Sequence, residues 1–184
     1  PDAYGNLGCA LDVSVSNGVS TNAGNITVSG GTLETKNGYI SMSTTGAEDG
    51  HGLFTVTGGT IENSGQISGA KELDISGGTV QSQGVVVGAL TLSGGTLTIR
   101  EAVRKNPYHK KLLVRPAVDA STLTVSGGTL DAAWDWGEFT PIVFPVDNYY
   151  GYADPLVKIT GYNSSATFNG GTTILDTGCA GNTA

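Results

Sequence analysis

One eight-residue pattern, present in six copies, constrains the fold of this chain more than any other feature. It reads apolar-Thr-apolar-Ser-Gly-Gly-Thr-apolar, as in Leu123–Leu130, and its glycine pairs begin at residues 30, 58, 77, 94, 127 and 170. Alternating apolar residues bury one face of a short strand, and two glycines allow a turn with positive φ. Each copy therefore predicts a strand, a turn and a second strand.

The spacing between the copies selects the architecture. Successive glycine pairs are 28, 19, 17, 33 and 43 residues apart. A step of 17 residues is too short for a βαβ unit or a propeller blade, but it suits one turn of a coil with three short strands. Six such layers would form a core about 29 Å tall. We therefore expect an all-β, parallel β-solenoid of about six coils, with a β-sandwich as the alternative.

Composition narrows the class of protein. A chain of 184 residues fits a single domain, 1–184, and its 29 glycines favour short strands and turns over helices. The net charge of −7 argues against nucleic acid as a partner, and no apolar stretch is long enough for a membrane span. The chain begins at Pro1 without a signal-like segment, so we expect a mature or excised form of a secreted protein, extracellular or on the cell surface.

Two cysteines, Cys9 and Cys179, lie near opposite ends of the chain. In a simple stack these are opposite ends of the rod, whereas bridged Cα atoms must come within about 7 Å. Three interpretations stay open: a disulfide to a terminal segment that folds back, two thiols, or a bond between neighbouring molecules.

The 33-residue step contains a basic insertion, residues 99–117. Six of the nine Lys and Arg residues fall in it: Arg100, Arg104, Lys105, Lys110, Lys111 and Arg115. On an acidic protein this favours an anion-facing patch for an acidic glycan or cell-surface polymer. The alternative is a solvated loop or a short helix that packs on the rod, with Pro107 confining any helix to the residues before Asn106.

The 43-residue step contains an aromatic and acidic insertion, residues 131–160. Its candidate binding residues are Trp134, Trp136, Phe139, Tyr149, Tyr150 and Tyr152. Aromatic rings beside carboxylates suit sugar stacking, and they also suit protein interfaces. The alternative is a cluster that packs over the coil. The two insertions have opposite character, so they are expected to meet either within one molecule or between molecules.

Motifs for catalysis and for tightly bound metals are missing from the sequence. Neither His51 nor His109 has a triad motif around it, and two distant cysteines do not provide a zinc spacing. The acidic turn at Glu48 and Asp49 is the candidate calcium site, with two adjacent acids as its oxygen ligands. We expect no catalytic residues and no cofactor, with calcium at this turn as the alternative.

The repeated octad resembles that of secreted bacterial β-helix proteins of the pectate-lyase-like, carbohydrate-binding type. The resemblance covers the repeats from Ile26 to Leu130 and those from Asn169 to Ile174. It implies a right-handed parallel β-helix, which in some members binds acidic polysaccharide and often lacks lyase activity.

The combined features predict a non-catalytic extracellular β-solenoid. It would act as a surface adhesin or as a self-assembling, filament-like structural subunit, because the open ends of a solenoid need a cap or a partner. The alternative is a polysaccharide-binding module that uses the aromatic insertion with the basic segment. A polysaccharide lyase or hydrolase is the remote alternative.

Overall fold

The computed structural model describes residues 8–12, 24–42, 52–105, 112–137 and 154–178. These residues are about 67% strand, and no helix is present among them. The first strands along the chain are β1 (Gly8–Asp12), β2 (Ile26–Thr35), β3 (Gly38–Ser41), β4 (Leu53–Asn63), β5 (Gln66–Ser68), β6 (Glu72–Ile75), β7 (Thr79–Ser82) and β8 (Gly84–Leu92). The later strands are β9 (Thr96–Ala102), β10 (Arg104–Lys105), β11 (Leu112–Leu113), β12 (Val118–Val125), β13 (Thr129–Asp135), β14 (Val157–Ile159), β15 (Ser165–Phe168) and β16 (Thr172–Asp176).

Fourteen of these strands form one sheet that is not closed into a barrel, and every pairing within it is parallel. The pairings fall into three ladders. The first ladder holds the segments before the glycine pairs, in β2, β4, β6, the end of β8, the end of β12, and β15. The second ladder holds the segments after them, in β2, β4, β7, β9, β13 and β16. The third ladder is β1, β3, β5, the start of β8, the start of β12, and β14.

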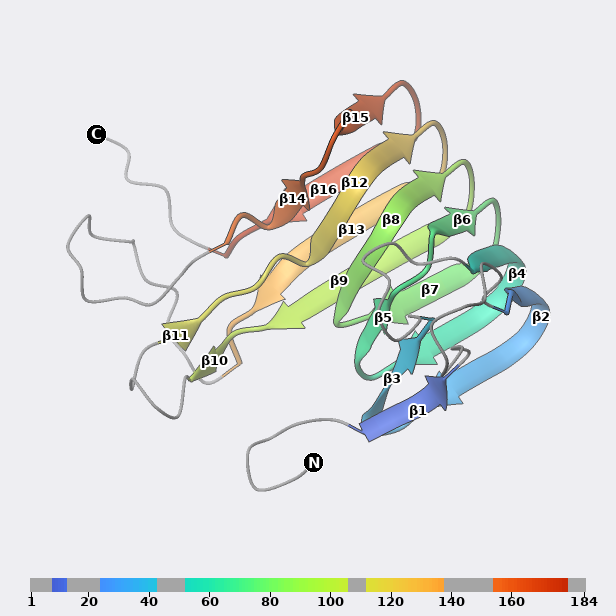
Figure 1. Ribbon diagram of the computed structural model, residues 1–184, viewed down its shortest axis with the longest axis horizontal. Helices are drawn as coiled ribbons and strands as arrows, with labels where there is room; N and C mark the ends of the chain where they lie inside the picture. The colour runs from blue at the N-terminus through green and yellow to red at the C-terminus, as the bar shows by residue number, and fades with distance from the viewer. Residues whose placement is uncertain (1–7, 13–23, 43–51, 106–111, 138–153, 179–184) are drawn as a thin grey trace.

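The six copies of the octad stack in register, as the sequence predicts. Thr32 lies opposite Thr60, and the column continues through the Thr that follows each later glycine pair, ending at Thr172. Figure 1 shows these passes of the chain piled from β1 (blue) at one end to β15 and β16 (red) at the other. The described parallel topology is compatible with a β-solenoid and differs from the antiparallel hairpins of a sandwich.

Inward-facing apolar residues of the ladders form one continuous core. Phe54, Ile75, Leu92 and Val125 are fully buried, and each belongs to a different layer. The residues between them on the same strands, such as Thr91 and Thr124, face outward and are only partly buried. Period-two patterning therefore decides which side chains enter the core.

The two glycines of each pair are required for different reasons. The second glycine has positive φ in all six copies, for example +71° at Gly31 and +70° at Gly128, which side chains rarely tolerate. In the five copies after the first, the first glycine lies against a carbonyl oxygen of the layer before it. A Cβ atom at Gly127 would lie 2.2 Å from the oxygen of Ser93, so no side chain fits there.

A short row of polar residues runs through the first three layers of the second ladder. Thr35, Asn63 and Ser82 are all buried. Thr35 Oγ1 donates to Asn63 Oδ1 at 2.6 Å, and Asn63 Nδ2 donates to Ser82 Oγ at 3.1 Å and to the Gly65 carbonyl at 2.8 Å. These bonds satisfy the buried amide, so the row joins three layers.

Candidate functional site

Both predicted insertions leave the stack at the same corner, in adjacent layers. The basic segment connects β9 to β12, and the aromatic segment connects β13 to β14. Their described parts touch: the Val103 amide donates to the Asp135 carbonyl at 2.8 Å, and the Asp154 amide donates to the Val114 carbonyl at 3.2 Å. The two segments therefore meet within one molecule, at the left of Figure 1.

The strands extend further into both segments than the sequence suggests. β9 continues to Ala102 and β13 to Asp135, and the two pair in register over their full length. Beyond β9 the chain forms β10 and β11, a two-stranded antiparallel ribbon, where the alternative interpretation of the sequence was a solvated loop or a short helix. The ends of β9 and β13 pair with each other, and local sequence does not reveal this pairing between layers.

The tryptophans of the aromatic insertion are buried at this corner. Trp134 and Trp136 are 8% and 7% exposed, and their rings pack edge to face at a centroid distance of 6.2 Å. Trp134 Nε1 donates to the Arg115 carbonyl at 2.9 Å, and Trp136 Nε1 donates to the Thr177 carbonyl at 2.7 Å. The indoles thus connect both long segments with the exit of β16. The other four candidate aromatics, Phe139, Tyr149, Tyr150 and Tyr152, lie outside the described residues.

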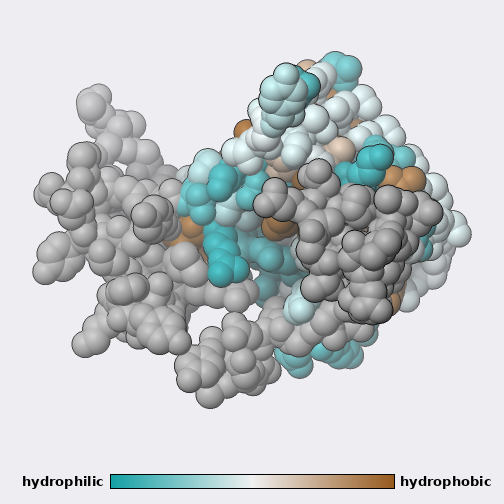
Figure 2. Space-filling model, in the orientation of Figure 1, coloured by the Kyte–Doolittle hydropathy of each residue, from teal (hydrophilic) through white to brown (hydrophobic). Residues whose placement is uncertain are grey.

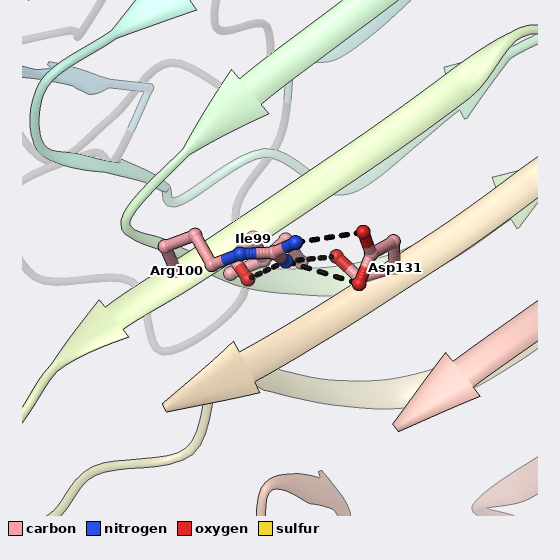
Figure 3. Close-up of polar contacts among 3 residues, drawn as sticks. All are labelled: Ile99, Arg100 and Asp131. Atoms are coloured by element: carbon pink, nitrogen blue, oxygen red, sulfur yellow. Dashed lines mark hydrogen bonds and ion pairs between the residues drawn. The ribbon is translucent and has the colours of Figure 1, made fainter. Parts of the chain in front are cut away.

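The basic patch is partly neutralised by the neighbouring layer. Arg100 on β9 makes a two-pronged contact with Asp131 on β13, at 2.7 Å from Nη2 to Oδ2 and 3.1 Å from Nη1 to Oδ1 (Figure 3). Arg115 is exposed. Arg104 and Lys105 form β10, but the structure describes only their backbone. Lys110 and Lys111 lie outside the described residues. Arg100 and Arg115 are thus both exposed, and Arg100 is paired with Asp131.

The Arg100–Asp131 pair should contribute little to stability. The two side chains are 44% and 26% exposed, and pairs of this kind are worth about 1 kcal/mol or less. In a double-mutant cycle of Arg100→Ala and Asp131→Ala, we expect a coupling free energy of about 0.5–1 kcal/mol, measured by urea unfolding. The coupling should shrink in high salt. A coupling above about 2 kcal/mol would contradict this assignment.

A buried carboxylate, Glu101, was missed by the sequence analysis. It is 2% exposed and lies opposite Trp134 in the ladder. A Cβ atom at Gly84 would lie 2.8 Å from Glu101 Oε2, so this glycine leaves the space that the carboxylate occupies. Its neighbours Arg100 and Arg104 suggested a solvated charged run, and no local signal separates Glu101 from them.

A shallow, open depression of about 400 Å³ lies over the outer surface of the second ladder, near the N-terminal end of the stack. Its wall includes Glu34, Glu62 and Gln81, which occupy the same place in three successive repeats. Lys36 also lines it and pairs with Glu34 at 3.1 Å. Glu34, Glu62 and Gln81 each lie two residues after the Thr of their repeat. The repeats alone could therefore have indicated this row of polar residues.

The last layer of the stack is open on one side. All residues of β15 and β16 are exposed, and these strands pair only with β12 and β13 among the described strands. Phe168 lies in register with the fully buried Val125 yet is 52% exposed, and Leu175 lies in register with the buried Ala132 yet is 49% exposed. Inward positions of the repeat are thus uncovered at this end.

Comparisons of the chain with family models, curated proteins and solved structures gave no match. Within the described residues there is no helix long and apolar enough to cross a membrane. The described ranges also contain no group of three or more His, Cys, Asp or Glu arranged to hold a metal ion. The calcium candidates Glu48 and Asp49 lie outside these ranges, as do His51, His109 and Cys179.

Proposed function

We propose that this protein is a non-catalytic, extracellular, right-handed parallel β-helix that serves as a self-assembling structural subunit or surface adhesin. The in-register repeats provide a rigid spacer, and the ends of the stack provide the contacts between subunits. The segments at the insertion corner are the second contact region, suited to an acidic glycan or an acidic cell-surface polymer through the basic residues.

The open last layer carries this proposal. Among the described strands, β15 and β16 each have one edge without a partner, and such edges are templates for the addition of another strand. The exposed Phe168 and Leu175 add apolar surface at the same place. By contrast, Figure 2 shows that the described lateral surface in this view is mostly hydrophilic or intermediate, with small scattered hydrophobic areas. Association through this end would cover the exposed apolar residues Phe168 and Leu175.

Sedimentation velocity and negative-stain electron microscopy test the assembly. We expect the sedimentation coefficient to increase with protein concentration and rods longer than one subunit to form. A single monomeric species at every concentration up to the millimolar range would contradict the proposal. Non-reducing gels run beside these samples would show whether Cys9 and Cys179 link the subunits.

A polysaccharide-binding module is the second candidate. The depression lined by Glu34, Glu62 and Gln81 supports it, because carboxylates and amides in a row suit the hydroxyl groups of a sugar chain. A glycan array that includes acidic polysaccharides tests it, with Tyr149→Ala as the aromatic variant. Trp134→Ala and Trp136→Ala are less suitable probes, since these buried rings also hold the corner together. A lyase or hydrolase, the remote third candidate, would release new chain ends from the bound polymer.

A further inference from the structure

The two ends of the stack have complementary steps. The third ladder begins with β1, which precedes β2 in the chain, so at the N-terminal end it projects one strand beyond the other two ladders. At the C-terminal end the third ladder stops at β14, while the first and second ladders continue to β15 and β16. There the third ladder is one strand short. The N-terminal end therefore has the extra strand that is missing at the C-terminal end.

We infer that these steps are a head-to-tail docking site for a second copy of this chain. This inference rests on the proposed assembly and specifies its geometry. With β1 of the incoming copy on β14, its β2 lies on β15 and β16, and all three parallel ladders continue without a gap. The register of the repeat then places Thr27 over Thr167, Val28 over Phe168 and Thr32 over Thr172.

The glycine pair of the first layer fits this occupant. In each later layer the first glycine lies against a carbonyl of the layer before: a Cβ atom would come 2.4 Å from the Thr57 oxygen at Gly77 and 2.2 Å from the Ser126 oxygen at Gly170. At Gly30 no atom of the described residues lies within 4 Å. The docked copy would bring the Asn169 carbonyl to that place. Gly30 thus leaves free the space that a preceding layer needs.

Two of the three inward positions bring apolar side chains together: Ile26 meets Ala166 and Val28 meets Phe168, whereas Leu33 meets Thr173. At the first layer Ile26, Val28 and Leu33 are only partly buried, although they pack against the core. In the docked arrangement Phe168 meets the smaller Val28, as large and small residues alternate in a packed core. The backbone register of the third ladder also places residue Asp12 of β1 opposite Lys158 of β14, two residue types of opposite charge.

A valine at residue 30 tests the docking. Gly30→Val should leave the far-UV circular dichroism and Tm of the monomer unchanged, because the position is open and its φ is not in the left-handed region. It should weaken association at least tenfold, since the side chain collides with the incoming carbonyl. Ser29→Val is the matched control: it adds bulk at the neighbouring exposed residue, where Thr57 and Asn169 occupy the equivalent places, and should associate like the wild type.

A mixing experiment tests the head-to-tail polarity. Phe168→Asp places a charge on the opposite docking surface, so it and Gly30→Val should each remain monomeric alone. Their equimolar mixture should form dimers and stop there, because one intact pair of ends remains. Rods of the wild type should show an axial repeat of about 29 Å, the height of six layers.

The outcomes separate the two ideas. If the wild type stays monomeric, both the proposed assembly and this docking site are wrong. If the wild type forms rods and Gly30→Val forms them equally well, assembly stands and the docking site is wrong. If the mixture of the two variants builds long rods or forms no dimer, the head-to-tail polarity is wrong.

Discussion

Replacing Gly128 with alanine should lower the free energy of unfolding by about 4 kcal/mol or more, which is a large share of the whole stability of a single domain. The residue has a φ of +70°, and a Cβ atom there would lie 2.5 Å from the Gly95 carbonyl oxygen and 2.7 Å from the Gly94 carbonyl carbon. Both of these atoms belong to the backbone, so they cannot move aside as the end of a flexible side chain would. The layers must therefore shift apart, which disrupts the parallel hydrogen bonds on both sides.

Gly31→Ala is the matched control for this change. Its φ is +71°, but no atom of the described residues lies within 4 Å of the added Cβ. The free energy of unfolding of this variant should fall only by the cost of the left-handed backbone conformation, about 1–2 kcal/mol. Urea unfolding of dilute samples, followed by circular dichroism, gives both free energies of unfolding. Equal losses in the two variants would mean that contact between layers does not explain the glycine requirement.

The second large effect is expected from Asn63→Asp. The Asn63 amide donates to Ser82 and Gly65 and accepts from Thr35, all in a buried site. An ionised carboxylate there loses both donated hydrogen bonds and is removed from water, which should cost about 3–5 kcal/mol at neutral pH. Gln81→Glu is the matched control, because it makes the same chemical change at an exposed residue of the next layer.

The loss in Asn63→Asp should depend on pH in a definite direction. Burial disfavours the charged form and raises the folded-state pKa of the new carboxyl above its unfolded value of about 3.9. The neutral acid is tolerated, so the variant should approach wild-type stability below about pH 4 and lose it as the pH rises through the folded-state pKa. Urea unfolding at a series of pH values measures this. A loss independent of pH would show that the carboxyl has the same pKa in the folded and unfolded states, as it would if it reached water.

The repeat predicts the stacking well because it encodes contacts between layers as well as local structure. The Thr column and the glycine pairs each follow from one octad placed on the next, and the register Leu123 to Leu90 confirms it. The parallel stack, the strand-turn-strand units and a turn with positive φ at the glycine pair were expected from the chain, while the structure shows that the second glycine takes the positive φ. The carbonyl contact at the first glycine needed the structure, since it depends on the distance between layers.

The corner was harder to predict because its contacts join segments that no repeat relates. Trp134 and Trp136 could be interpreted from the sequence as binding residues or as part of a cluster packed over the coil, and the structure buries both rings. Arg100 read as part of a basic patch, although the adjacent layer supplies Asp131. The buried Glu101 looks like any solvated charge in the sequence. Each of these outcomes depends on which layer lies beside which.

The uninterrupted layer between Gly77 and Gly94 makes the height of this protein adjustable by whole units. It has the same register with the layers on both sides, and its step of 17 residues contains no insertion. Removing or duplicating such a unit leaves every remaining layer facing an equivalent octad, so the core contacts are replaced by similar ones. Gene duplication within the repeat could therefore lengthen or shorten the molecule by about 4.8 Å at a time without redesigning either end.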